Sequence, residues 1–208
     1  MLGMKRGLVA VVLAGSLVSG VAQASVFTGV IVDTGPGSVS GPQWALSSNQ
    51  GLSGEFSVYI PVKVTDVQGW INGGNGTATA AIYMVGIDKP GTELYSAAFT
   101  ADAASDWDGA SGLNWLLGPG TYWVAFEVRS GQTLIGNMPS PSGSPLGNEA
   151  YSSAAGTYFP YDALQLGVRI FGEEQTQTQV PEPMSLALFG LGLGGLAVTR
   201  RRRAFGAS

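Results

Sequence analysis

The sequence contains no histidine and no cysteine, and only 12% of its 208 residues are charged. Without cysteine the chain has no disulfide, no thiolate nucleophile and no Cys/His zinc site. Without histidine it has no Ser-His-Asp triad, and acid–base chemistry would depend on carboxylates. Because the chain cannot form the disulfides that many exported proteins use, it must be stabilised by core burial or by bound ions. We expect a protein that is not an enzyme and has no obligatory cofactor.

Basic residues are scarce between residues 25 and 172. This stretch has four basic and eleven acidic residues, a net charge of −7, and the acidic ones are scattered. Nucleic-acid binding requires clustered lysine and arginine. We therefore expect no nucleic-acid partner.

The middle of the chain has the composition and periodicity of β-structure. Glycine is frequent, at 32 residues, aromatic residues make up 10%, and valine and threonine recur. Many segments alternate apolar and polar residues with period two, and no convincing amphipathic helix interrupts them. The strands we expect, about eight in all, include residues 26–33, 56–64, 77–87, 93–99, 113–117, 121–129 and 164–170. This pattern predicts an all-β fold, a single β-sandwich with a jelly-roll-like arrangement.

Some of these segments carry more detailed expectations. Residues 56–64 alternate as one strand, and Pro61 predicts that it is an edge strand or carries a bulge. Residues 72–76 (NGGNG) are typical of a turn. Residues 113–129 form an expected hairpin around Gly118-Pro119-Gly120, with Tyr122 and Val124 on one face of its second strand and Trp123 on the other.

The N-terminus has the three parts of a secretory signal peptide. Lys5 and Arg6 precede an apolar run at 7–18, and Ala22-Gln23-Ala24 then provides the small residues that signal peptidase requires. We expect cleavage after Ala24, so that residues 1–24 are removed and Ser25 begins the exported chain. The alternative is a buried N-terminal helix. The predicted domains that follow are a passenger at 25–172 and a polar linker at 173–180.

The C-terminus has a short apolar segment with a basic stop. Residues 184–199 carry no charge, and as a helix these 16 residues would span about 24 Å of a hydrocarbon core of about 30 Å. Arg200, Arg201, Arg202 and Arg203 follow directly, and the positive-inside rule keeps them in the cytoplasm. A G-x-G-x-x-G pattern within the segment lacks the βαβ context of a dinucleotide site, so we reject that reading.

This tail resembles the PEP-CTERM sorting signal of Gram-negative bacteria. Pro181, Glu182 and Pro183 match its Pro-Glu-Pro signature, 184–199 its transmembrane segment, and the arginines its basic stop, so the signal spans 181–203. The resemblance implies processing by an exosortase, a membrane enzyme, in an exopolysaccharide or biofilm context. The protein would be exported across the inner membrane, transiently anchored with its C-terminus in the cytoplasm, and then delivered to the cell surface or beyond. The alternative is a permanently membrane-anchored surface protein.

One acidic loop suggests calcium. Asp102, Asp106 and Asp108 lie close together before a glycine, as oxygen ligands of calcium often do, although the closing glutamate of an EF-hand is missing. The alternative is a solvated turn in which these side chains cap backbone amides. Asp106 and Asp108 are also the pair that a calcium-stabilised carbohydrate-active enzyme would use, with one as acid and the other as base or nucleophile.

Aromatic side chains suggest a weak interaction with polysaccharide, because flat rings stack on sugars. We expect Trp70 and Trp115 in the core. The aromatic residues that we expect to be exposed and available for glycan contact are Trp107, Trp123, Tyr151, Tyr158 and Tyr161, of which the tyrosines belong to a long loop at 137–161. The sequence thus predicts a surface or matrix protein that is structural or binds glycan weakly.

Overall fold

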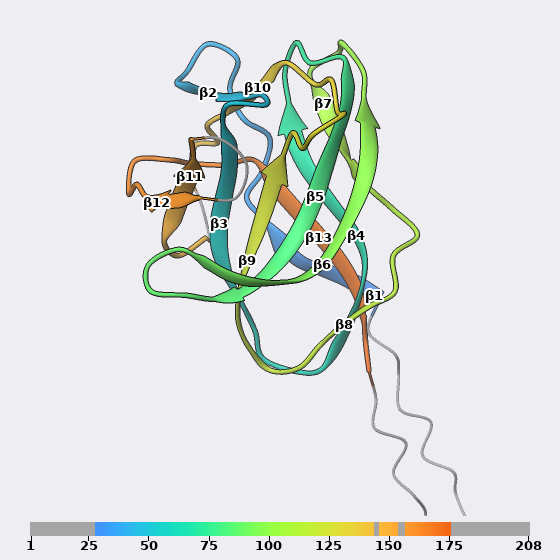
Figure 1. The fold of residues 1–208 in the computed structure, drawn as a ribbon. Helices are drawn as coiled ribbons and strands as arrows, with labels where there is room; N and C mark the ends of the chain where they lie inside the picture. The colour runs from blue at the N-terminus through green and yellow to red at the C-terminus, as the bar shows by residue number, and fades with distance from the viewer. Residues whose placement is uncertain (1–27, 144–145, 154–156, 176–208) are drawn as a thin grey trace, which may run out of the picture.

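The computed structural model describes residues 28–143, 146–153 and 157–175. These residues form an all-β fold without a helix, which confirms that the passenger is all-β as predicted. Two antiparallel sheets face one another, the six-stranded sheet in front and the five-stranded sheet behind it (Figure 1). A small two-stranded sheet lies at one end. The predicted signal peptide and the sorting signal at 181–203 lie outside the described residues.

The five-stranded sheet has the order β1-β13-β4-β7, with β8 also paired to β4. Its strands are β1 (Thr28–Asp33), β4 (Val62–Ile71), β7 (Asp106–Ala110), β8 (Trp115–Leu117) and β13 (Val168–Glu174). The six-stranded sheet has the order β12-β11-β3-β9-β5-β6. Its strands are β3 (Gly51–Val58), β5 (Gly76–Val85), β6 (Pro90–Ala101), β9 (Gly120–Glu127), β11 (Glu149–Ser152) and β12 (Tyr158–Pro160). The two-stranded sheet pairs β2 (Gln43–Leu46) with β10 (Gly136–Pro139).

Eight of these strands pair in a nested order. Counted along the chain as β1, β3, β4, β5, β6, β7, β9 and β13, the first pairs with the last, the second with the seventh, the third with the sixth and the fourth with the fifth. This is how a long antiparallel hairpin rolls into a jelly roll. The pairing of β1 with β13 brings both ends of the described chain together, with Thr28 opposite Glu173.

A single core fills the space between the two sheets. It combines β3 and β9 residues such as Leu52 and Phe126 with Val64, Val67 and Ile170 from the facing sheet. The alternation predicted for β9 is confirmed, since Val124 and Phe126 belong to this core whereas Trp123 and Ala125 belong to a separate cluster on the outer face of the sheet.

Two predicted local arrangements are wrong. Residues 56–64 are not one strand, because β3 ends at Val58 in one sheet and β4 begins at Val62 in the other, and Ile60 between them is exposed. Residues 113–129 are not a hairpin, because β8 pairs with β4 while β9 pairs with β3 and β5. In both places the chain crosses between sheets. The first crossing keeps the period-two alternation of a continuous strand, and the second contains the turn residues of a hairpin. Sequence periodicity therefore does not distinguish these crossings from a strand or a hairpin.

The tryptophans also differ from expectation. Trp115 is buried as predicted, but Trp70 is only half-buried, on the outer face of the five-stranded sheet. Trp123 is 0% exposed, packed with Tyr83, Tyr158 and three alanines, so the expected exposure of Trp123 and Tyr158 is wrong. These aromatics are buried because the β11–β12 hairpin extends the six-stranded sheet and contributes Ala150 and Tyr158 to its outer face.

A polar network borders this outer cluster. Glu127 is buried and accepts hydrogen bonds from the hydroxyls of Tyr83, at 2.7 Å, and Tyr158. Arg129 donates to Glu127 at 2.7 Å and to Glu93 at 2.6 Å. Burial, followed by the charge of Glu127, raises the pKa of Tyr83 well above its usual value. The network therefore holds neutral tyrosines around a carboxylate and joins β5, β6, β9 and β12.

The network predicts that Glu127→Gln destabilises the protein. The substitution removes the charge that pairs with Arg129 and replaces a carboxylate oxygen with an NH₂ group facing donors. We expect the free energy of unfolding to fall by about 1–3 kcal/mol, measured by urea denaturation. Asp66→Asn, on the outer face of the other sheet, is the matched control. Equal stability of the two variants would show that the network contributes no net stability.

Candidate functional site

Four aromatic side chains form a cluster at the flank of the sandwich. Trp44 and Tyr161 are 5.5 Å apart between ring centroids, Tyr151 and Tyr161 are 5.8 Å apart, and both pairs are edge-to-face. Tyr151 and Phe159 are 5.9 Å apart and tilted. We call Trp44, Tyr151, Phe159 and Tyr161 the aromatic cluster.

The β11–β12 hairpin and the two-stranded sheet position this cluster. Tyr151 of β11 lies directly opposite Phe159 of β12 in the antiparallel register, and the amide of Tyr161 donates to the carbonyl of Glu149 at 2.8 Å. Trp44 belongs to β2, and its indole Nε1 donates to Ser140 at 3.1 Å. The rings are therefore fixed by backbone pairing and by one side-chain hydrogen bond.

Part of the cluster faces solvent. Phe159 is 43% exposed and Tyr161 is 41% exposed, whereas Trp44 and Tyr151 are half-buried beneath them. A rigid, partly exposed group of rings provides flat apolar surface at little cost in side-chain entropy, and it suits the apolar face of a sugar.

The structure brings together only some of the residues proposed for glycan contact. Tyr151 and Tyr161 lie in the aromatic cluster, whereas Tyr158 is on the opposite face of the same hairpin, buried beside Trp123. Trp44 and Phe159 are members that the sequence analysis missed. The Tyr-Phe-Pro-Tyr run at 158–161 could have indicated a strand with alternating faces, but its glycine- and serine-rich surroundings are typical of a loop.

Trp107 lies elsewhere, on the outer face of the five-stranded sheet. Its ring is edge-to-face with Trp70 at 5.3 Å, and the guanidinium of Arg169 is 4.1 Å from its centroid. Arg169 is held by Asp33 at 3.1 Å. A sugar would have to compete with this cation–π contact for the covered ring face. Trp107 is therefore a weaker platform than the aromatic cluster.

The acidic loop has the features of a capped turn. Asp102 accepts from the amide of Ala104, and Asp106 accepts from the amide of Trp107, each at 2.7 Å. Burial, followed by the charge of Asp102, raises the pKa of Asp108 to about 6. Within the described ranges no three carboxylates converge as a metal-binding group. The expected convergence of Asp102, Asp106 and Asp108 on a calcium ion is therefore not seen.

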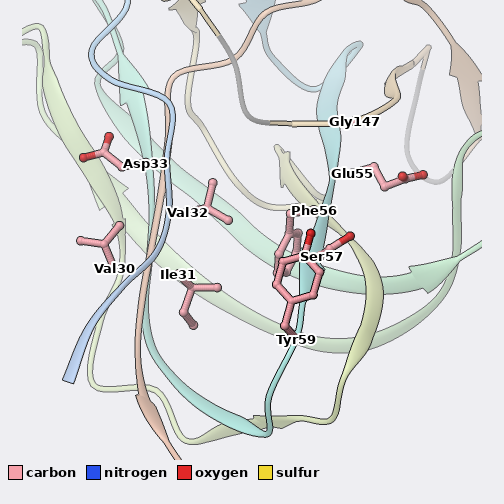
Figure 2. A pocket seen from close by; sticks show the side chains of 9 residues that line it. All are labelled: Val30, Ile31, Val32, Asp33, Glu55, Phe56, Ser57, Tyr59 and Gly147. Carbon is pink, nitrogen blue, oxygen red and sulfur yellow. The ribbon is translucent and has the colours of Figure 1, made fainter. Parts of the chain in front are cut away.

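A cleft opens between β1 and β3. It has a volume of about 510 Å³ and apolar walls, with Val30, Ile31 and Val32 on one side and Phe56 and Tyr59 on the other (Figure 2). Asp33, Glu55, Ser57 and Gly147 complete the lining. This volume is within the usual range for small-molecule sites. No pattern in the sequence indicated it, because the two walls come from separate sheets.

Strand pairing explains why the cleft is open. Among the described residues β1 pairs only with β13, and β11 pairs with β3 from Gly51 to Gly54, with two further backbone hydrogen bonds that join Glu55 to Gly147 and Asn148. The part of β3 beyond Glu55 and the other edge of β1 are therefore free toward the cleft. Gly147 lies two residues before β11, so the cleft opens near the hairpin that carries the aromatic cluster.

Glu149 is the most unusual titratable group near the cluster. It is 6% exposed at the start of β11, and its Oε1 has no hydrogen-bond partner among the residues that the structure describes. Burial raises its pKa to about 8, an effect opposed by a backbone hydrogen bond from Leu166 and increased by the charge of Asp162. Because its carboxyl group is enclosed, it does not offer a proton to a bound sugar. Its position instead makes the hairpin sensitive to pH.

This raised pKa predicts that the protein loses stability at alkaline pH. The unfolded state has the ordinary glutamate pKa of 4.5, so the folded state binds one more proton until the pH exceeds about 8. The free energy of unfolding should therefore fall by about 2 kcal/mol from about pH 6.5 to about pH 8.5, a range in which Asp108 is already mostly ionised. Urea denaturation at the two pH values measures this change in the free energy of unfolding.

Glu149→Gln should remove this pH dependence, and Glu174→Gln, at the end of β13, should retain it. A Glu149→Gln variant with the wild-type pH slope would contradict the assignment.

The remaining predicted residues lie outside the part that the structure describes. These are the signal-cleavage residues Ala22, Ala24 and Ser25, the motif Pro181–Pro183, and Arg200 to Arg203. Over residues 28–143, 146–153 and 157–175 no helix has the length and apolar character needed to cross a membrane.

Comparison with known proteins identifies the tail. No curated protein matches the chain. A family model described as the PEP-CTERM protein-sorting motif matches residues 179–203, the same segment that carries the Pro-Glu-Pro signature. The motif implies processing by an exosortase-type enzyme and delivery to the cell surface or the extracellular space. The chain therefore carries a PEP-CTERM sorting signal, as its sequence predicted.

Proposed function

We propose that this protein is an exosortase-sorted surface or matrix protein whose passenger is mainly structural and binds polysaccharide weakly through the aromatic cluster. The observation that carries the proposal is the grouping of Trp44, Tyr151, Phe159 and Tyr161 with two rings exposed. The sorting motif at 179–203 supports the surface location. The polysaccharide context is what the resemblance of the tail implies.

The proposal gives the tail a temporary role. Residues 184–199 hold the exported passenger in the inner membrane with Arg200 to Arg203 in the cytoplasm, and the exosortase then releases it. Thr28 and Glu173 are paired, so both ends of the passenger leave from the same side of the sandwich. In this geometry the end of the sandwich that carries both chain ends is nearest the bilayer, and the opposite end of the sandwich is farthest from it.

The proposal includes no catalytic activity and no calcium. Asp106 caps a backbone amide, one oxygen of Asp108 is buried, and the carboxyl of Glu149 is enclosed. A glycosidase needs two carboxylates on either side of an accessible bond. Asp106, Asp108 and Glu149 do not provide such a pair.

Binding by the aromatic cluster would be weak for each copy. One sugar stacked on one ring gains about 0.5–1.5 kcal/mol beyond area burial. Affinities near millimolar, about −4 kcal/mol, are then expected for a single site. Many copies on one surface would raise the avidity for a long polymer.

The sorting step predicts the ends of the mature protein. Intact-mass analysis of protein recovered from the cell surface should give Ser25 as the first residue and a C-terminus between Pro181 and Met184. The expected change is loss of the apolar segment together with the four arginines. A surface protein that retains Arg200 to Arg203 would support the permanent-anchor alternative instead.

The glycan proposal predicts the effect of two substitutions. Tyr161→Ala and Phe159→Ala should each weaken co-sedimentation with the producer's own polysaccharide by roughly threefold to tenfold, since each removes a stacking ring. Tyr59→Ala removes an exposed tyrosine that lines the cleft and serves as the matched control. If only Tyr59→Ala reduced binding, the glycan site would be the cleft and not the aromatic cluster. If the wild-type protein did not bind at all, the proposal would be refuted.

A further inference from the structure

Exposed apolar side chains gather at one end of the sandwich. Twelve large hydrophobic residues are exposed in the described part of the chain, and six of them lie at this end. Tyr59, at 87%, and Ile87, at 88%, are the two most exposed of the twelve. We call the six residues the apolar tip: Tyr59, Ile60, Met84, Val85, Ile87 and Leu116.

Strand register places these residues at the same end. Tyr59 and Ile60 follow Val58, the last residue of β3, which is paired with Gly120, the first residue of β9. Met84 of β5 is paired with Tyr122, two residues further along β9, so β5 reaches its turn at the same level. That turn contains Ile87 and is closed by a hydrogen bond from Gly86 to Lys89 at 3.0 Å.

The third part of the tip comes from β8. Leu116 is paired with Lys63, next to the first residue of β4, and its carbonyl accepts from the hydroxyl of Tyr95 at 3.0 Å. In Figure 1, β8 and the connection from β3 to β4 form the lower end of the sandwich. The β5–β6 turn projects to one side of this end in Figure 1, so the tip is made of two separate turns and one short strand.

The described chain ends at this tip. Glu174 is paired with Val62, and the amide of Gln175 donates to the carbonyl of Pro61 at 2.8 Å. The β3–β4 turn is therefore in direct contact with the point from which the chain continues toward the sorting signal at 179–203.

The distance to the apolar tail is short. Met184 is nine positions after Gln175, and a fully extended chain covers at most about 30 Å over that length. If residues 184–199 lie in a bilayer, the nearest part of the passenger is the apolar tip. We propose that the tip rests on the bilayer surface while the tail is inserted, with its apolar side chains in the interfacial region.

The chemistry of the tip fits a lipid surface. Apolar and aromatic side chains on turns can enter the interface without exposing unpaired backbone to the hydrocarbon core. Lys63 and Lys89 at this end are outnumbered by Asp88, Glu173 and Glu174, a net charge of −1, so apolar burial rather than charge drives the contact. The contact should therefore occur on neutral lipid and be no stronger on anionic lipid.

The contact would have a consequence for sorting. A passenger resting on its tip keeps the short connection at 176–180 beside the membrane surface, where an integral membrane enzyme acts. The inference rests on the proposed insertion of residues 184–199, so the experiment must report on both.

The absence of cysteine allows single labels at chosen sites. The full-length chain, carrying an environment-sensitive fluorophore at Tyr59→Cys, Ile87→Cys or Leu116→Cys, is reconstituted into phosphatidylcholine vesicles with nitroxide-labelled lipid. Ser48→Cys is the matched control, because it is exposed in the turn before Gly51, at the opposite end of β3. Leu188→Cys reports on the tail. All five variants should retain the wild-type unfolding midpoint.

We expect quenching and a blue shift at the three tip positions and at Leu188, and neither at Ser48, with no increase in quenching when phosphatidylglycerol is added. Quenching at Leu188 without quenching at the tip would overturn the inference and leave the inserted tail intact. No quenching at Leu188 would refute tail insertion and the inference with it. Equal quenching at Ser48 and at the tip would also overturn the inference.

Discussion

The pairing of β1 with β13 is the interaction on which the rest of the structure depends. It joins the first described strand to the last, with Thr28 opposite Glu173 and Asp33 opposite Arg169. Thr34 extends the contact, since its hydroxyl donates to the carbonyl of Leu166 at 2.8 Å and accepts from the amide of Val168 at 2.7 Å. These bonds link residues more than 130 positions apart, so forming them closes a loop that contains most of the other strands, at a cost in chain entropy.

This closure also replaces the covalent links that many exported domains use. The chain has no cysteine, and the loop between β1 and β13 contains nearly the whole passenger. Closing so long a loop without a disulfide requires many weak interactions. The buried core between the sheets, the outer cluster around Trp123 and the Glu127 network supply them. The outer cluster has a cost for function, because it removes Trp123 and Tyr158 from the surface.

The sequence predicted the type of fold better than the path of the chain. Alternation identified which residues of β9 face the core, and turn residues located the start of β5. The crossings at 59–61 and 118–119 were missed, because alternation reports the face of a strand and not the sheet to which it belongs. The aromatic cluster was half predicted for a similar reason. Tyr151 and Tyr161 were identified, but Trp44 joins them only through the pairing of β2 with β10.

The surfaces of the passenger lie at different distances from the end where β1 pairs with β13 and the chain leaves the sandwich. β13 ends at the apolar tip. The acidic loop lies at the opposite end of the sandwich, just before β7, where Ser105 donates to Asn72. The aromatic cluster lies on the flank, on a hairpin that pairs with the end of β3 away from the tip. When the tip faces the membrane, the exposed rings of Phe159 and Tyr161 are therefore displaced from the lipid surface. The same strand order that brings the two chain ends together thus separates the surface that we propose for lipid from the surface that we propose for polysaccharide.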